Sequence, residues 1–180
     1  MTMNTTLRRR TVVAALGIGS LCPSLARAEP QAIYRPWPRE RATPPLTLPG
    51  LDGAPWSSAA ARGRVLLLHF WAGWCEPCRA EMPALDAWAR QHAPRGVQVM
   101  AINYREGEAV IRRFLDQNPA SLGLSILRDA DGGAARAWDV RVFPSTVVIA
   151  RDGRPAFSLI GEVDWAGESL RQWMAPLLTP

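Results

Sequence analysis

Two cysteines separated by two residues, Cys75 and Cys78, constrain this chain more than any other feature. A strongly apolar run, residues 65–70, leads into them, and a helical pattern over residues 78–92 leads away from them. The pair therefore stands where a buried strand passes into a helix. Unpaired N–H groups and a partial positive charge at a helix N-terminus lower the pKa of a thiol placed there. This combination predicts a site for thiol–disulfide exchange.

The place of each cysteine at this junction suggests its role. Cys75 is outermost and is the expected nucleophile, whereas Cys78 lies one turn further in and is the expected resolving thiol, which breaks the mixed disulfide. Pro77 lacks an N–H and is tolerated in the first turn of a helix. Glu76 puts a carboxyl group between the sulfurs and should disfavour the thiolate. We expect both residues, with Trp74, to support the reactive pair.

Two other readings of the cysteine pair are a structural disulfide and half of a zinc site. A zinc site would need a second pair of Cys or His at ligand spacing. The chain has only two histidines, His69 in the expected strand and His92 at the far end of the helix. We therefore expect no metal site and no cofactor beyond a redox-active disulfide. A different class of function stays open, because a reduced thiol pair favours Cu(I).

The N-terminus has the organisation of an export signal. Three arginines at positions 8–10 precede a short apolar stretch, residues 11–21, and Ala26-Arg27-Ala28 provides a small-x-small cleavage site. We expect residues 1–28 to be a signal peptide that is cleaved after Ala28, which predicts a periplasmic protein. The apolar stretch is too short for an ordinary membrane span. An uncleaved anchor is the alternative, and a membrane association is expected only in that case.

The composition of the chain limits the classes of binding partner that we expect. The chain has 180 residues and a formal net charge of +5, but four of its arginines lie in the expected signal. The mature protein is then almost neutral, so nothing in its charge favours nucleic acid. The third cysteine, Cys22, also lies in the signal. Cys75 and Cys78 have no competitor in the mature chain, as expected for a catalytic pair in an oxidising compartment.

The residues around the cysteines resemble a known family. The stretch Leu-Pro-Gly-Leu-Asp-Gly at 48–53, followed by residues 62–85 with the Trp-Cys-Glu-Pro-Cys motif, resembles the extracytoplasmic TlpA/ResA/DsbE branch of the thioredoxin superfamily. The resemblance covers residues 44–180. It implies an α/β, thioredoxin-like fold: a central mixed sheet flanked by helices, with an N-terminal β-hairpin and an inserted strand–helix. Residues 29–43, which contain three prolines, are expected to form an extended linker before this domain.

The resemblance also implies an activity. It predicts a monomeric enzyme that exchanges thiols and disulfides with other proteins, reducing narrow substrates such as apocytochrome c or copper-site cysteines. A membrane thiol carrier would supply the electrons. Oxidation of folding proteins is the alternative direction. A peroxidase of the peroxiredoxin pattern would need threonine three residues before the reactive cysteine, and Ala72 stands there.

Two ionisable residues close to the motif are candidate proton carriers. His69 stands six residues before Cys75, where cytoplasmic thioredoxins have a buried aspartate, and an imidazole there could handle the proton of the second cysteine. A core histidine without that role is the alternative. Glu81 follows Cys78 by one helical turn, and the resembled branch often has glutamate there. Its carboxyl group could shuttle protons and raise the thiol pKa values, or it could simply be solvated.

A proline far along the chain completes the expected site. Pro144 stands just before a β-branched strand and looks like the cis-proline loop of the superfamily, which lies against the two sulfurs. The backbone of Phe143, just before it, could pair with an extended substrate as an added strand. Phe143 is bulkier than the residue that family members usually have there, so substrate choice does not transfer.

Overall fold

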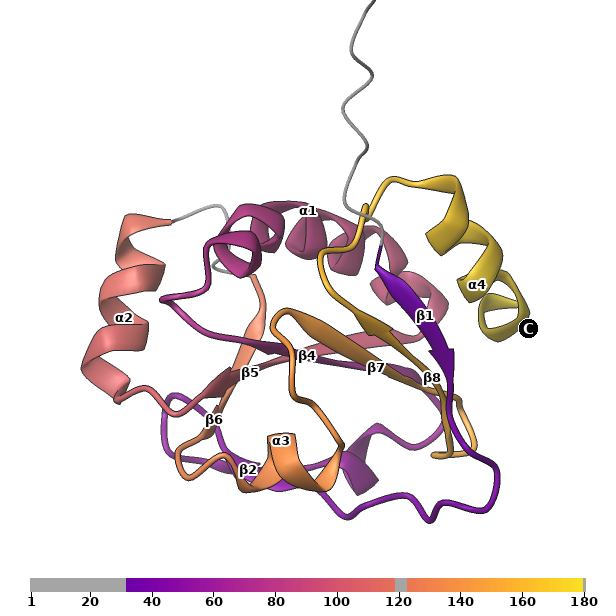
Figure 1. Cartoon of the computed structure of the whole chain (residues 1–180), viewed down its shortest axis with the longest axis horizontal. Coiled ribbons are helices and arrows are strands. Elements are labelled where there is room, and N and C mark those ends of the chain that lie inside the picture. The colour runs from indigo at the N-terminus through magenta and orange to yellow at the C-terminus, as the bar shows by residue number, and fades with distance from the viewer. Residues whose placement is uncertain (1–31, 119–122, 180) are drawn as a thin grey trace, which may run out of the picture.

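A six-stranded mixed sheet forms the centre of the computed structural model, which describes residues 32–118 and 123–179 (Figure 1). Two further short strands pair as a separate hairpin. In spatial order the six strands are β1 (Ile33–Pro36), β8 (Pro155–Ile160), β7 (Ser145–Ile149), β4 (Val65–Trp71), β5 (Val97–Tyr104) and β6 (Ser125–Asp129), and the hairpin consists of β2 (Thr47–Pro49) and β3 (Pro55–Ser57).

The direction of the strands changes at β4. β4, β5 and β6 run parallel and are connected through helices, whereas β7 pairs with β4 in the antiparallel sense. All seven residues of β4 are buried. A central strand covered on both faces reads as a continuous apolar run, which is the pattern of residues 65–70.

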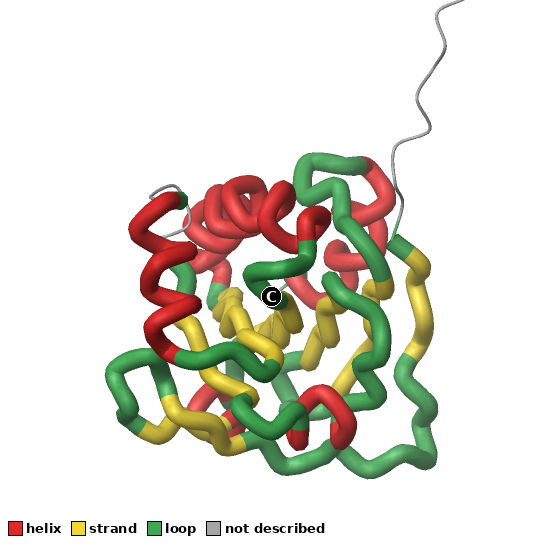
Figure 2. The backbone as a smooth tube through the Cα atoms, turned by 60° about the vertical axis from the view of Figure 1, so that its left-hand side comes forward, coloured by secondary structure: helices red, strands yellow, loops and turns green. Residues whose placement is uncertain are grey.

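Helices cover the two faces of the sheet unequally. α1, α2 and α4 contribute buried side chains to one face, and the short α3 packs on the other face together with the β2–β3 hairpin (Figure 1). Figure 2 shows the strands between these two layers. The helices are α1 (Glu76–His92), α2 (Glu108–Gln117), α3 (Gly133–Ala137) and α4 (Glu168–Leu178), and single 3-10 turns cover Ser58–Ala61 and Ala93–Arg95.

Alternate residues of β4 supply two separate hydrophobic cores. Leu67 and Trp71 point to the face of α1, where the Trp71 and Phe114 rings lie 4.9 Å apart. Leu68 and Phe70 point to the face of α3. This alternation fixes the register of the central strand, because a slip by one residue would exchange the two faces. The strand therefore delivers the cysteine motif to one defined place at its C-terminal end.

The predicted thioredoxin-like architecture is confirmed: the central sheet is mixed and flanked by helices, and β2 and β3 form the expected N-terminal β-hairpin. One boundary was wrong. Within the predicted linker 29–43, Ile33–Pro36 forms the edge strand β1 and pairs with β8. The folded domain therefore begins before residue 44. The edge position explains the error, because all four residues of β1 are exposed and show no apolar alternation.

The predicted signal peptide, residues 1–28, lies outside the described residues. Within residues 32–118 and 123–179, no helix has both the length and the apolar character that a membrane crossing requires.

Candidate functional site

The two cysteines lie at the N-terminus of α1 and form a disulfide, with an S–S distance of 2.09 Å and a Cα–Cα distance of 5.3 Å. Cys75 is the N-cap residue, and its sulfur accepts a hydrogen bond from the N–H of Cys78 at 3.3 Å. Cys75 is 6% exposed, whereas Cys78 is 0% exposed. The order of exposure is the predicted one. An attacking partner reaches Cys75 more easily than Cys78.

The residues between the cysteines occupy the first turn of α1. Pro77 is the second residue of α1, where its missing N–H costs no hydrogen bond. Glu76 is exposed and forms an ion pair with Arg79. Because this cation partly offsets the carboxylate, Glu76 should disfavour a thiolate at Cys75 less than the sequence alone suggests.

A second loop lies beside the cysteine motif. The Phe143–Pro144 peptide bond is cis, as predicted. The ring of Phe143 meets the 65% exposed ring of Trp74 edge-on, with centroids 5.9 Å apart, and it also packs against Tyr104 at 4.7 Å. Trp74 directly precedes Cys75, so this contact brings together two segments that are about 70 residues apart in sequence. Phe143 and Trp74 form an aromatic wall next to the more exposed cysteine.

A buried polar pair lies on the inner side of the motif. His69 on β4 and Glu81 on α1 are both buried, and His69 Nε2 lies 3.5 Å from Glu81 Oε1. The other ring nitrogen, Nδ1, lies 3.0 Å from Thr146 Oγ1 on β7. The other carboxyl oxygen, Oε2, accepts the N–H of Val163 at 2.7 Å and the indole N–H of Trp165 at 3.3 Å. Four segments of the chain thus converge on one acid and one imidazole.

Burial decides the charge of this pair. It raises the pKa of Glu81 from the ordinary 4.5 to about 8, even though the hydrogen bonds from Val163 and Trp165 favour the carboxylate. It lowers the pKa of His69 from 6.5 to about 3. Both side chains are therefore uncharged at neutral pH. Their 3.5 Å contact joins a carboxylic acid to a neutral imidazole and is not an ion pair.

Sequence reasoning missed three side-chain partners of the site. Thr146 faces His69 because these two residues are paired in the register of β7 and β4. Trp165 reaches Glu81 from the segment that follows β8. Glu106 accepts the N–H of Gly73 at 2.6 Å and the Asn103 amide at 2.7 Å, which ties down the turn before Cys75. Of these three residues, only Glu106 could have been found from the sequence, because it is a polar residue that follows the C-terminal end of the parallel strand β5.

The structure thus brings the predicted residues together in two groups. Trp74, which directly precedes Cys75, meets Phe143 on the outer side, and the cis peptide bond joins Phe143 to Pro144. His69 and Glu81 form the buried pair on the inner side of α1. Their roles in exchange stay predictions. Among the residues that the structure describes, no group of three or more His, Cys, Asp or Glu side chains could hold a metal ion.

The chain is similar to proteins of a known family. The profile of the AhpC/TSA family matches residues 40–154. A thiol-disulfide oxidoreductase ResA of Halalkalibacterium halodurans is 29% identical over 130 residues, which are 72% of this chain and 66% of that protein. The thioredoxin-like protein YneN of Bacillus subtilis is 34% identical over 113 residues, 61% of this chain and 64% of that protein. The matches thus span about two thirds of the length of these relatives.

Solved structures show the same fold. A structure described as a thiol:disulfide interchange protein DsbE from Chlorobium tepidum is 29% identical and superposes with a TM-score of 0.68, covering 76% of this chain and 94% of that one. A secreted disulfide oxidoreductase of Mycobacterium tuberculosis is 28% identical, with a TM-score of 0.63 over 73% of this chain and 96% of that one.

Proposed function

Since this chain belongs to the AhpC/TSA family and is a thioredoxin-like protein of the ResA and DsbE type, we propose that it is a periplasmic thiol–disulfide oxidoreductase that reduces disulfides of specific exported proteins. The observation that carries the proposal is the Cys75–Cys78 disulfide at the N-terminus of α1. The proposed activity does not include that of a peroxidase, because Ala72 stands where the peroxiredoxin pattern has threonine.

The reaction proceeds by two exchanges from the reduced pair. The Cys75 thiolate attacks one sulfur of the substrate disulfide, forms a mixed disulfide and releases the other substrate sulfur as a thiolate. Cys78 then loses its proton and attacks the Cys75 sulfur. This step releases the second substrate thiolate and forms the Cys75–Cys78 disulfide. Two electrons pass from the cysteine pair to the substrate, whose two thiolates take up protons.

Glu81 is the group best placed to handle the proton of Cys78. It lies one helical turn after Cys78 on α1, and both side chains are buried. A pKa of about 8 lets this carboxyl group take and return a proton near neutral pH, where an ordinary glutamate would stay ionised. His69, which lies between Thr146 and Glu81, positions the carboxyl group and is not itself a base at neutral pH.

The outer side of the site supports substrate contact. The backbone of Phe143 offers pairing to an extended polypeptide, and Pro144 has no N–H that would compete for it. The exposed ring of Trp74 gives the partner an apolar surface beside Cys75. Substrates of this kind are protein disulfides such as those of apocytochrome c haem-site cysteines or copper-site cysteines.

The remaining parts of the proposal concern the cellular setting. Cleavage after Ala28 would release a monomer into the periplasm, and an uncleaved signal would tether it to the membrane. A membrane thiol carrier would return the electrons. No cofactor other than the redox-active disulfide takes part.

Trapping tests the assignment of the two cysteines. The Cys78→Ser variant should accumulate mixed disulfides with protein substrates, because the Cys75 thiolate still attacks but nothing resolves the product. Cys75→Ser should abolish exchange. Non-reducing electrophoresis of the two variants, expressed with their signal, separates the outcomes. Trapping by Cys75→Ser instead of Cys78→Ser would overturn the roles.

The reduction potential tests the direction of electron flow. A value near or below about −270 mV, that of thioredoxin, would support a reductant with a dedicated electron supply. A value near about −120 mV would mark a strong oxidant and would move the function to disulfide formation. Tight uptake of Cu(I) by the reduced protein, lost in Cys78→Ser, would instead support a copper-handling role.

A further inference from the structure

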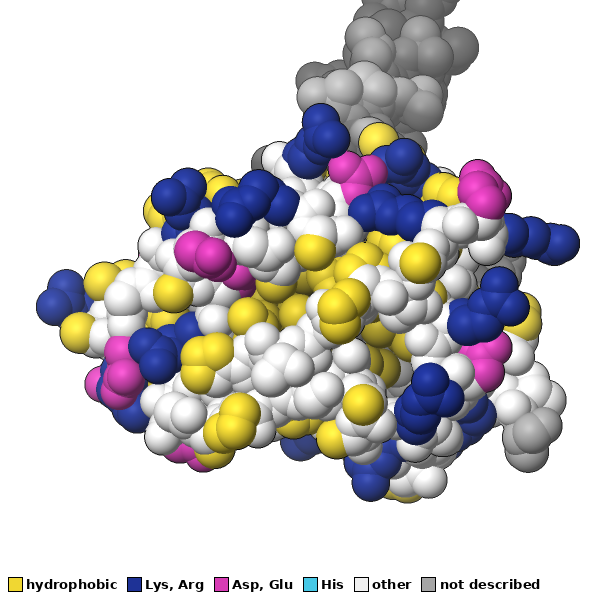
Figure 3. Space-filling view, turned by 90° about the horizontal axis from the view of Figure 1, so that it is seen from below, with side chains coloured by type: hydrophobic (Ala, Val, Ile, Leu, Met, Phe, Trp, Pro, Cys, Tyr) yellow, Lys and Arg dark blue, Asp and Glu magenta, His cyan; other side chains and the backbone are white. Residues whose placement is uncertain are grey.

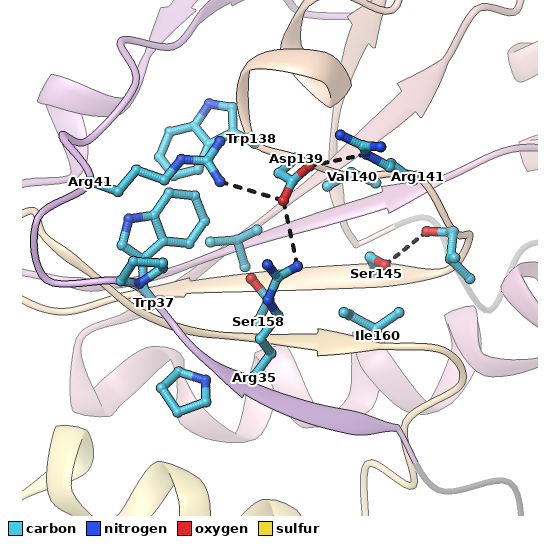
Figure 4. Close-up of a pocket in the computed structure, with 14 residues that line it drawn as sticks. Arg35, Trp37, Arg41, Trp138, Asp139, Val140, Arg141, Ser145, Ser158 and Ile160 are labelled. Atoms are coloured by element: carbon cyan, nitrogen blue, oxygen red, sulfur yellow. Dashed lines mark hydrogen bonds and ion pairs between the residues drawn. The ribbon is translucent and has the colours of Figure 1, made fainter.

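A pocket of about 440 Å³ lies on the α3 face of the sheet, away from the buried His69–Glu81 pair (Figure 4). Its floor is formed by residues of β7 and β8. Its walls come from β1, from residues 37, 38 and 41 that follow it, and from residues 138–142 before the cis-proline. No part of the proposed exchange reaction uses this pocket.

The lining of the pocket is strongly basic. Three guanidinium groups surround one carboxylate, that of Asp139, which is the single acidic residue in the lining. Arg35 and Arg41 approach its Oδ2 atom at 3.4 and 3.6 Å, and Arg141 donates to Oδ1 at 3.1 Å (Figure 4). Each guanidinium carries five N–H donors, so a single carboxylate cannot accept hydrogen bonds from all the donors of three guanidinium groups. Positive charge and free donors remain.

One arginine is held by several partners, whereas the other two contact Asp139 and are largely exposed. The guanidinium of Arg41 stacks over the Trp37 ring at 4.5 Å and donates to the carbonyl of Ala137 at 2.9 Å. The side chains of Arg35 and Arg141 are 55% and 85% exposed. The pocket thus combines a cation stacked on an aromatic wall with two exposed cations at its rim.

The pocket adjoins the segment that would contact substrate. Val142 and Ser145 both line it, and they flank Phe143 and Pro144 directly in sequence. The Ser145 hydroxyl donates to the Val142 carbonyl at 2.8 Å, across the cis-proline. A polypeptide paired with the backbone of Phe143 would therefore have residues beside the attacked cysteine within a short reach of the three arginines.

We propose that this pocket binds an acidic segment of the substrate polypeptide, next to the cysteine that Cys75 attacks. The proposal rests on the proposed function and names its substrate class. Carboxylates match the planar fork of a guanidinium in geometry and charge. On the face that carries α3, Figure 3 shows hydrophobic side chains in a hollow and basic side chains around it. Residues 1–31 of this chain carry four arginines and one glutamate, so they have the wrong charge to be the occupant.

Direct binding tests the pocket without any exchange reaction. The oxidised protein is titrated by calorimetry with a cysteine-free decapeptide rich in glutamate and with its glutamine counterpart. The acidic peptide should bind more tightly, and added salt should weaken it. Replacing Arg35 and Arg141 together by Gln should weaken the binding of the acidic peptide about twofold to thirtyfold, the range for two exposed ion pairs.

A matched control separates the pocket from net charge. Arg64→Gln combined with Arg113→Gln removes the same charge from two exposed residues that do not line the pocket. This control should keep the affinity for the acidic peptide. Equal binding of the two peptides, or an equal loss in the control, would overturn the proposal. Equally tight binding of inorganic sulfate would also overturn it, since the site would then be one for small anions.

A second arm links the pocket to the reaction. Two disulfide peptides that differ only in acidic or neutral residues beside the cysteine are offered to the reduced protein. The wild type should prefer the acidic peptide in kcat/KM, and the Arg35/Arg141 variant should lose that preference while reducing the neutral peptide normally. If neither peptide is reduced, the proposed function fails, and the binding arm still decides the pocket.

Discussion

Replacing Glu81 by Gln should change how the stability of this protein depends on pH. Glutamine keeps the shape of the side chain, and its carbonyl oxygen can still accept the hydrogen bonds from Val163 and Trp165. Its amide can donate to Nε2 of His69. The substitution therefore removes the titration of residue 81 and preserves its contacts.

The magnitude follows from the two shifted pKa values. Glu81 has a pKa of about 8 in the folded protein and 4.5 ordinarily. The folded state thus holds an extra proton between these pH values, and the free energy of unfolding falls by about 1.4 kcal/mol per pH unit as pH rises through them. The stabilisation is complete below pH 4.5 and is lost by about pH 8.

His69 has the opposite effect over a different range. Its pKa is about 3 when folded and 6.5 ordinarily, so its contribution rises with pH through that interval and is complete above pH 6.5. The two slopes cancel between pH 4.5 and 6.5, where stability should be flat. Between pH 6.5 and 8 only Glu81 acts, and stability should fall by about 2 kcal/mol. The other shifted carboxyl groups, Asp131 and Glu168, have lowered pKa values and act below this range.

Urea unfolding of the oxidised protein, in which the cysteines do not titrate, measures this fall. With a slope of about 1–3 kcal/mol per molar urea, the midpoint of the wild type should drop by roughly 1 M between pH 6.5 and 8.

Glu81→Gln should show no drop. His69→Asn should extend the fall down to pH 4.5. Glu162→Gln should keep the fall but end it at lower pH, because the Glu162 charge raises the pKa of Glu81. A wild-type midpoint that is constant from pH 6.5 to 8 would refute the assigned burial effect.

Two further predictions concern the reduced pair and the turn before it. In the reduced protein, Glu81→Gln should lower the apparent thiol pKa values by about one unit. The Glu81 carboxyl group ionises near pH 8, and its charge then opposes thiolates that form in the same pH range. Titration of thiolate absorbance checks this, and an unchanged titration would leave Glu81 without influence on the pair. Glu106→Gln should raise amide exchange at Gly73 about fivefold, since the charge-assisted hydrogen bond weakens by about 1 kcal/mol. Glu108→Gln removes the charge of a half-buried acid nearby on α2 and should leave that amide unchanged. Equal effects of the two variants would contradict the anchoring role of Glu106.

The elements that carry the cysteine motif were predictable because their signals are local. The apolar run at 65–70 is the buried strand β4, and the helix after it was placed to within two residues at its start. The position of Pro144 just before a β-branched strand allowed the cis-proline loop to be predicted. Edge strand β1 was not predicted, because its four residues are all exposed and show no alternation of apolar and polar side chains.

The sequence by itself determined the reactive pair, since a Cys-x-x-Cys motif between a buried strand and a helix needs only local chain geometry to become a capped disulfide. Tertiary structure alone decided the environment of that pair. His69 faces Thr146 through the register of β4 and β7, and Glu81 meets His69, Val163 and Trp165 only once α1 and the segment after β8 are packed. Burial, and with it the shifted pKa values, depends on all of these segments together. No local pattern encodes how much water is removed from a side chain, so the charge of Glu81 is a property of the packed fold.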